Sequence, residues 1–451
     1  MNKIFATSLI AAFACLCASA KGTETLKWQS AIDAAHAAGG GRVTIPAGDH
    51  KVGSLSLKSN VELHLSKGSR LIAVADKDLF KPAVEIKYVE GNPCAIIVAI
   101  CATNVAVTGE GEIFGNAPQF DSFKKGTQKP MGLCFYKCSD VKLEDFYLHD
   151  AAAWGINFIR SENIVARRIR INNHAGECTD GFDIEAKNVL IEDCDVDAGD
   201  DAYCLKSNDP DYAVENITIR RCIARTHCNA YKLGTASHGI MRNISFVDCK
   251  AAPARRVYRD LGPMPKDLLN WQPVPGAPWY LCGPGFGAVN VECVDGGLVE
   301  NVVADNIEVE GYQTPLFIRA GDRKNREYAP QGNKFVVRNI VFSNIRGRAD
   351  GRTVSTITGT DKCRPYNIVL KNINIEVPGE GESNKPFSWP GEESAGAYPQ
   401  TNMFDAYRLP AYGLFIDKAD GVKIENVNFT LRKGTSDKRP PVFKTDKCDR
   451  M

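Results

Sequence analysis

The sequence predicts an all-β protein, a right-handed parallel β-helix (a solenoid) with a short N-terminal capping helix. The first observation is a motif of Asn or Asp followed by alternating apolar residues, which recurs along most of the chain. The second is its spacing. Copies start at Asp140, Asn163, Asn188, Asn216 and Asn243, at intervals of 23, 25, 28 and 27 residues. Each unit holds two or three short alternating runs, as strands do, and the period is too short for a propeller blade.

The third observation is the start of the β-rich region. Residues 28–38 combine alanines with spaced apolar residues, which predicts a helix, and Gly39 to Gly41 end it. Residues 42–46 and 54–57 then alternate with period two, so they are expected to be strands. A helix at this place would cover the exposed strand edges of the first coil.

Further copies of the motif begin at Asn104, Asn339, Asn367 and Gly421. The Asn that opens most copies suits a turn, because its amide can bond nearby backbone. The chain has 16 cysteines, and Cys194, Cys222 and Cys249 share one repeat position. We expect these three to stack in the interior as small apolar side chains.

The N-terminus resembles a secretory signal peptide. Residues 1–3 are basic, residues 4–17 are mostly apolar, and Ala18-Ser19-Ala20 suits cleavage. This predicts a signal peptide over 1–20, one β-helix catalytic domain over 21–451, and export to the periplasm or the exterior. A buried N-terminal helix, or a lipid anchor on Cys15 or Cys17, are the alternatives.

Composition limits the partners. The net charge of +1 indicates neither nucleic acid nor an acidic membrane surface. No later apolar run reaches the roughly 18 residues that a membrane span needs. We expect a monomer.

Two long segments rich in Pro, Gly and aromatic residues interrupt the repeat. One runs over 253–287 with Trp271 and Trp279, and the other over 378–412 with Trp389. Loops of this length are usually either functional or disordered. Their aromatic side chains could stack on sugar rings, or could pack on the coil wall.

Three aspartates stand in small-residue turns one coil apart. Asp180 precedes Gly181, and Asp200 and Asp201 follow Gly199. On adjacent coils they cannot all ionise freely, so one is expected to keep a raised pKa and act as an acid. The spacing can supply both an acid and a base that activates water. A turn role for each Asp, or a calcium site, are the alternatives; we expect no metal and no cofactor.

With these motifs the chain resembles glycoside hydrolase family 28, the polygalacturonase family, and in particular its bacterial exo-type branch. Cys178-Thr179-Asp180-Gly181 and Gly199-Asp200-Asp201 resemble two of its motifs. The resemblance implies an inverting hydrolase of plant pectic polysaccharide or oligosaccharide. It implies Asp200 as general acid, with Asp180 and Asp201 activating the water.

The chain departs from the family after these motifs. Asn229 replaces a family histidine, and His227 lies two residues earlier, on the same strand face if the strand continues. Asn290 and Glu292 stand where the family has Arg and Lys that hold a galacturonate carboxylate. Either the sugar there is neutral, or other cations hold its carboxylate. The candidates for such cations are Lys232, Arg319 and Arg323.

The sequence therefore predicts an exported glycosidase of galacturonan or rhamnogalacturonan type, exo-acting because long loops could close one end of the cleft. A β-helix polysaccharide lyase and a non-catalytic pectin-binding solenoid are the alternatives.

Overall fold

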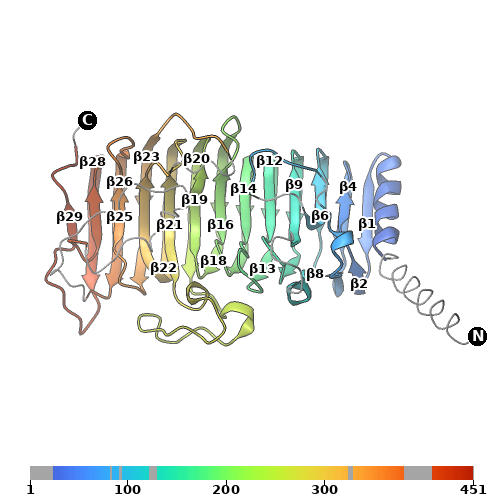
Figure 1. Ribbon diagram of the computed structural model, residues 1–451, viewed down its shortest axis with the longest axis horizontal. Helices are drawn as coiled ribbons and strands as arrows, with labels where there is room; N and C mark the ends of the chain where they lie inside the picture. Colours follow the sequence, from blue (N-terminus) through green and yellow to red (C-terminus); the bar gives the residue numbers. More distant parts are fainter. Residues whose placement is uncertain are drawn as a thin grey trace, which may run out of the picture.

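The computed structural model describes residues 24–81, 84–90, 94–120, 129–323, 329–379 and 409–449. Strands lie side by side along the long axis, with the N-terminal helix at one end (Figure 1). They pair in parallel, each with the strand one coil before and one coil after. The predicted β-helix with its capping helix is confirmed. The strands form three stacks.

The first stack contains the strands that start with the repeated Asn or Asp. Several long strands turn a corner of the coil and contribute to two or three stacks. The strands that lie only in the first stack are β1 (Gly41–Ile45), β4 (Val61–Leu65), β7 (Thr103–Thr108), β10 (Ser139–Glu144), β17 (Ala213–Arg220) and β23 (Val336–Ser343). The strands that it shares are β12 (Ile156–Arg167), β14 (Phe182–Glu192), β20 (Ile240–Ala252), β22 (Leu298–Ala320), β26 (Tyr366–Val377) and β28 (Asp420–Leu431).

The second stack is made of short strands. They are β2 (Gly48–Val52), β5 (Ser69–Ala73), β8 (Glu112–Phe114), β11 (Tyr147–His149), β13 (Arg170–Asn173), β15 (Asp195–Ala198), β18 (Ile223–Thr226) and β24 (Arg346–Ala349). The stack also receives parts of the long strands β20, β22, β26 and β28.

The third stack carries the site described below. Its own strands are β3 (Leu55–Leu57), β6 (Ala95–Ile100), β9 (Met131–Tyr136), β16 (Tyr203–Ser207), β19 (Asn229–Ser237), β21 (Gly285–Cys293), β25 (Ser355–Thr358), β27 (Leu414–Asp417) and β29 (Val442–Lys444). It also receives the first residues of β12 and β14 and the end of β22.

The interior is built from rows of like side chains on successive coils. Phe182, Tyr203 and Tyr231 stack with ring centroids 5.5 and 5.4 Å apart. Cys194, Cys222 and Cys249 are at most 4 % exposed. The predicted row of buried thiols is therefore confirmed, and every cysteine in the described part of the chain is a free thiol.

The Asn at the start of each coil forms a ladder along the first stack. Asn216 has φ of 59°, a left-handed conformation that Asn tolerates better than most residues. Its amide donates to Asn188, 3.0 Å away, and accepts from Asn243 at 3.1 Å. The amides thus bond to one another between coils, whereas we expected them to bond nearby backbone. Asn60 and Asn301 extend the same row.

The N-terminal helix spans residues 24–37, earlier than the 28–38 expected. Its side chains bond the unpaired backbone of the first coil. Glu24, Thr25 and Gln29 accept from the N–H groups of Lys51, Gly53 and Ser56. This satisfies an edge that would otherwise be open to pairing.

Four short 3-10 helices complete the described structure: η1 (Lys77–Leu79), η2 (Ala117–Phe120), η3 (Tyr258–Asp260) and η4 (Trp279–Leu281). The predicted signal peptide, Cys15, Cys17 and Trp389 lie outside the described residues. Within the described ranges, no helix has the length and apolar character to cross a membrane.

Candidate active site

The three predicted aspartates meet in one cavity on the outer side of the third stack. The cavity measures about 450 Å³, which is within the range of small-ligand pockets. Its walls come from β16, β19, the turns before them, and segments at residues 90, 154 and 280–286. The lining residues are Glu90, Trp154, Cys178, Asp180, Asp200, Asp201, Lys206, Cys228, Lys232, Gly234, Thr235, Tyr280 and Phe286.

Strand register brings the aspartates together. Phe182 of β14 pairs with Tyr203 of β16, and the Gly181 N–H donates to the Asp201 carbonyl at 2.8 Å. Asp180 and Asp201 therefore lie on adjacent coils at equivalent positions, as expected from their spacing.

Asp201 is the carboxylate that the cavity keeps ionised. Its Oδ2 lies 2.9 Å from the Lys232 ammonium, and its Oδ1 accepts from the Asn229 amide at 2.7 Å. Burial alone would raise the pKa of Asp201, but Lys232 and Asn229 lower it below its ordinary value. Asp201 can therefore accept a proton from water.

Asp200 has the opposite character. Its side chain is half-buried and reaches the cavity. Burial and the negative charge of Asp201 raise the pKa of Asp200 above its ordinary value. Asp200 is thus the carboxyl that can carry a proton to a leaving group.

Asp180 lies among other acids. It is 3 % exposed, and the Lys206 ammonium lies 3.9 Å from its Oδ2. Burial and the charges of Asp183 and Asp200 raise the pKa of Asp180 well above 3.8. Its other oxygen, Oδ1, is buried without a hydrogen-bond partner, which leaves it available to a water in the cavity.

Lys206 is a site residue that the sequence reasoning did not assign. Its ammonium lies 2.8 Å from the Glu90 carboxylate and 2.9 Å from that of Asp183. It also stands 4.2 Å from the centre of the Trp154 ring. Glu90 comes from a segment 116 residues earlier in the chain, so no local pattern could reveal it.

Lys232, Asn290 and Glu292 continue the polar row on the next coils. Lys232 of β19 pairs in register with Asn290 of β21. Asn290 donates to the Asn229 side chain, and Glu292 approaches the Lys232 ammonium at 3.8 Å. Glu292 is fully buried, so its charge acts on the cavity through Lys232.

His227 does not enter the cavity. Strand β19 begins at Asn229, so the strand does not continue back to His227 as the shared face required. The His227 ring nitrogens lie 2.9 Å from the Gly283 carbonyl and 3.0 Å from the Arg256 carbonyl. His227 thus joins the two ends of the 253–287 loop to the coil. Burial and neighbouring His174 lower the pKa of His227 to about 4.

Arg319 and Arg323 lie further along the third stack, outside the cavity lining. Arg319 pairs in register with Glu292 and donates to Thr358 and the Gly359 carbonyl. Arg323 is 2 % exposed and binds Asp295 through two bonds, of 2.9 and 2.7 Å. Both guanidinium groups are therefore engaged within the protein.

The 253–287 loop presents aromatic side chains in two ways. Tyr280 and Phe286 line the cavity. Trp271 packs against the Gly283 backbone, whereas Trp279 is 53 % exposed. Trp271 is therefore placed for packing on the protein, and the exposed Trp279 is placed where it could contact a sugar.

The ligand atoms of Asp200, Asp201 and Cys228 lie within 4.8 Å of one another. Burial and nearby Asp200 raise the pKa of the Cys228 thiol well above its ordinary value, which disfavours the thiolate that metals prefer. Lys232 already neutralises Asp201. These groups suit proton transfer better than metal binding.

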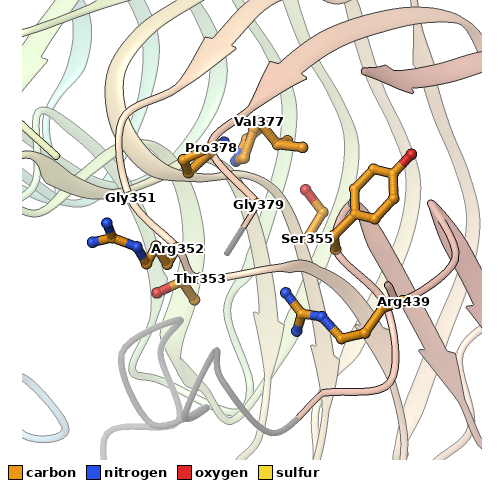
Figure 2. Close-up of a pocket in the computed structure, with 11 residues that line it drawn as sticks. Gly351, Arg352, Thr353, Ser355, Val377, Pro378, Gly379 and Arg439 are labelled. Atoms are coloured by element: carbon orange, nitrogen blue, oxygen red, sulfur yellow. The ribbon is translucent and has the colours of Figure 1, made fainter. Parts of the chain in front are cut away.

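A second hollow lies toward the C-terminal end, between the turn after β24, the turn after β26 and the segment before β29. Arg352 and Arg439 reach it from different turns (Figure 2). Its volume is about 10 Å³, room for about one water, so a sugar ring does not fit.

Comparison with known proteins identifies the family that the chain resembles. A family model described as glycosyl hydrolases family 28 matches residues 37–226, a range that includes all three aspartates. The resemblance to this family is confirmed. The protein is a glycoside hydrolase.

Relatives carry consistent names. An Aspergillus niger protein named as a galacturan 1,4-alpha-galacturonidase C is 25 % identical over 62 % of this chain and 68 % of its own. Polygalacturonase-2 of Solanum lycopersicum is 24 % identical over 63 % and 56 %.

Solved structures show the same fold. An exopolygalacturonase of Thermotoga maritima has a TM-score of 0.58 at 18 % identity, over 88 % of both chains. A family 28 exopolygalacturonase of Yersinia enterocolitica has a TM-score of 0.59 at 15 % identity, over 94 % of this chain and 75 % of its own.

Proposed function

We propose that the enzyme hydrolyses glycosidic bonds of pectic polysaccharide or oligosaccharide by an inverting acid/base mechanism. The supporting observation is the asymmetry within one cavity. Lys232 and Asn229 lower the pKa of Asp201, while burial and the Asp201 charge raise the pKa of its neighbour Asp200. The names of the relatives support the substrate class.

In this mechanism Asp200 protonates the glycosidic oxygen as the bond to the anomeric carbon breaks. Asp201 removes a proton from the attacking water on the opposite face of the sugar, and Asp180 orients that water through its free Oδ1. The anomeric configuration inverts because water attacks directly, with no covalent intermediate.

The proposal includes exo action. The segment 84–90 comes from the N-terminal coils and reaches the cavity at Glu90. It is held by Arg160, which donates to the carbonyls of Lys87 and Tyr88, and by the Glu90–Lys206 ion pair. A wall at one side of the catalytic centre favours chain ends over long uninterrupted chains. Release of single sugars from end-labelled oligosaccharides, without mid-chain cuts, is the expected result.

The acid and base can be separated by leaving group. Asp200→Asn is expected to lose about 10³-fold in kcat on natural oligosaccharides but to keep turnover of an aryl glycoside whose leaving group needs no proton. Asp201→Asn is expected to lose both. Equal losses of Asp200→Asn on the two substrates would contradict the acid role.

The same preparations decide between reaction classes. Proton NMR of the first product should show the inverted anomer. An unsaturated product absorbing in the ultraviolet would indicate a lyase instead, and tight binding without any product would indicate a binding solenoid.

We also propose export of a monomer. Buried thiols with raised pKa, such as Cys134, react slowly with oxidants, so they suit an oxidising compartment. Cleavage after Ala20 on expression with the full leader, and a single-chain mass in solution, are the expected observations.

A further inference from the structure

The cations that line the catalytic cavity are already bound to carboxylates of the protein. Lys206 lies within 2.9 Å of both Glu90 and Asp183. Lys232 lies 2.9 Å from Asp201 and 3.8 Å from Glu292. The positive charge of each ammonium is therefore already compensated by protein carboxylates before a ligand carboxylate binds.

Acidic side chains outnumber basic ones around this space. Within the described residues, the lining contains four acids, Glu90, Asp180, Asp200 and Asp201, and two lysines. The buried carboxyls of Asp183 and Glu292 stand close behind the lysines. A uronate placed here would add a like charge in a poorly solvated site, where repulsion is strong.

Nor does an arginine serve this purpose in the parts of the chain that the structure describes. Arg323 binds Asp295, and Arg319 bonds across to the next coil at Thr358 and Gly359. A planar carboxylate is best held by a guanidinium fork, and among the residues that the structure describes no guanidinium lines the cavity.

The uncharged part of the lining suits an uncharged ring. Trp154, Tyr280 and Phe286 supply aromatic surface, and the Cys178 and Cys228 side chains are apolar thiols. Such surface packs on the C–H faces of a sugar or on a methyl group. The carboxylates can accept hydrogen bonds from ring hydroxyls.

We infer that the sugar ring held in this cavity is neutral, a hexose or a 6-deoxyhexose and not a uronate, and that Glu90 and Glu292 determine this specificity. The inference rests on the proposed function, because it names which residue of a pectic chain occupies the catalytic cavity. Glu90 and Glu292 act by neutralising Lys206 and Lys232, which would otherwise attract a uronate.

The first test compares substrates for the wild-type enzyme. Oligosaccharides in which rhamnose alternates with galacturonate, or which end in galactose, should show kcat/KM at least about 100-fold above that of galacturonate oligomers, the equivalent of about 2.7 kcal/mol. Galacturonate oligomers cleaved equally well or better would overturn the inference.

The second test changes the charge. Glu292→Gln and Glu90→Gln should each remove one of the carboxylates around a lysine, which lowers the negative charge of the cavity. Each variant should improve kcat/KM on galacturonate oligomers relative to neutral-sugar substrates by about tenfold. Glu308→Gln, which removes an exposed partner of Lys250 on another face, is the matched control and should leave the ratio unchanged. An unchanged ratio in both cavity variants, with unaltered melting temperatures, would refute the role of these acids.

A binding measurement distinguishes failure of this inference from failure of the proposed function. Calorimetry of Asp200→Asn protein with galactose, rhamnose and galacturonate should show tighter binding of a neutral sugar. If no pectic substrate is hydrolysed, the proposed function fails, and this measurement still decides the inference. Tighter binding of galacturonate would overturn it.

Discussion

The two ends of strand β14 carry carboxyl groups with opposite surroundings. Glu192 ends the strand on the first stack and accepts bonds from Arg167, Arg220 and Arg221. Asp180 lies two residues before the strand, where the nearby groups are other acids and one lysine at 3.9 Å.

The pKa values of the two groups follow from these surroundings. Burial opposes ionisation of Glu192, but hydrogen bonds from Arg220, Arg167 and Arg221 lower its pKa to about 2. At Asp180, burial and neighbouring Asp183 act in the same direction and raise the pKa. The solenoid stabilises acids on its outer ladder with arginines from adjacent coils, and leaves acids in excess where chemistry is required.

The largest expected difference between these ends is in activity. Asp180→Asn should lower kcat/KM by about 10³-fold, because the water loses a carboxyl partner. Glu192→Gln should stay within about twofold of wild type. A comparable loss of kcat/KM in both variants would contradict this difference, because activity would then depend only on whether the coils remain folded. Steady-state kinetics with circular dichroism as the folding control decides this.

The free energy of unfolding should fall in the Glu192 variant, which keeps its activity. Glu192→Gln should cost about 1–2 kcal/mol at pH 7, because three partly exposed arginines lose their charged partner. The pKa of Glu192 is lower in the folded state than its ordinary 4.5. Its contribution is therefore complete above pH 4.5 and is lost as pH falls toward 2. Urea midpoints measured across this range test the sign.

Asp180→Asn should instead stabilise the fold at neutral pH. Its pKa is raised in the folded protein, so ionisation above pH 3.8 opposes folding, and the amide removes that opposition. A lower melting temperature for Asp180→Asn than for wild type at pH 7 would contradict the electrostatic account.

A smaller effect is expected at the loop that lines the cavity. His227→Ala should raise KM about threefold to tenfold with little change in kcat, because the 253–287 loop loses its link to the coil through Arg256 and Gly283. Hydrogen exchange should increase within that loop. His36→Ala, on the N-terminal helix and far from the cavity, is the control. Unchanged exchange in the loop would refute the linking role.

The smallest effect concerns the Asn ladder of the first stack. Asn216→Gly tolerates positive φ but loses the amide bonds to Asn188 and Asn243, and should cost about 1 kcal/mol. Asn216→Ala should cost more, because alanine also resists a left-handed backbone. Equal unfolding midpoints for the glycine variant and wild type would show that the ladder adds no stability.

The sequence predicted the features of the site that depend on the coil repeat. Asp180 and Asp201 are 21 residues apart, which is one coil, so their meeting could be predicted. Glu90 could not, because it lies outside the repeat and contacts a lysine 116 residues later. The partners of His227 belong to a loop whose path no periodicity describes. The charge balance of the cavity could not be predicted in full, because it depends on Glu90.

The Glu90–Lys206 contact has a consequence for how the chain assembles. In a solenoid each coil touches only its neighbours, so stability accumulates from one coil to the next. Glu90 precedes β6, and the third stack runs from β6 through β9, β12 and β14 before it reaches β16, where Lys206 lies. The ion pair spans these coils and ties their opening to one another. The catalytic centre thus sits in a stretch of the solenoid where the opening of one coil is coupled to the opening of the coils beside it.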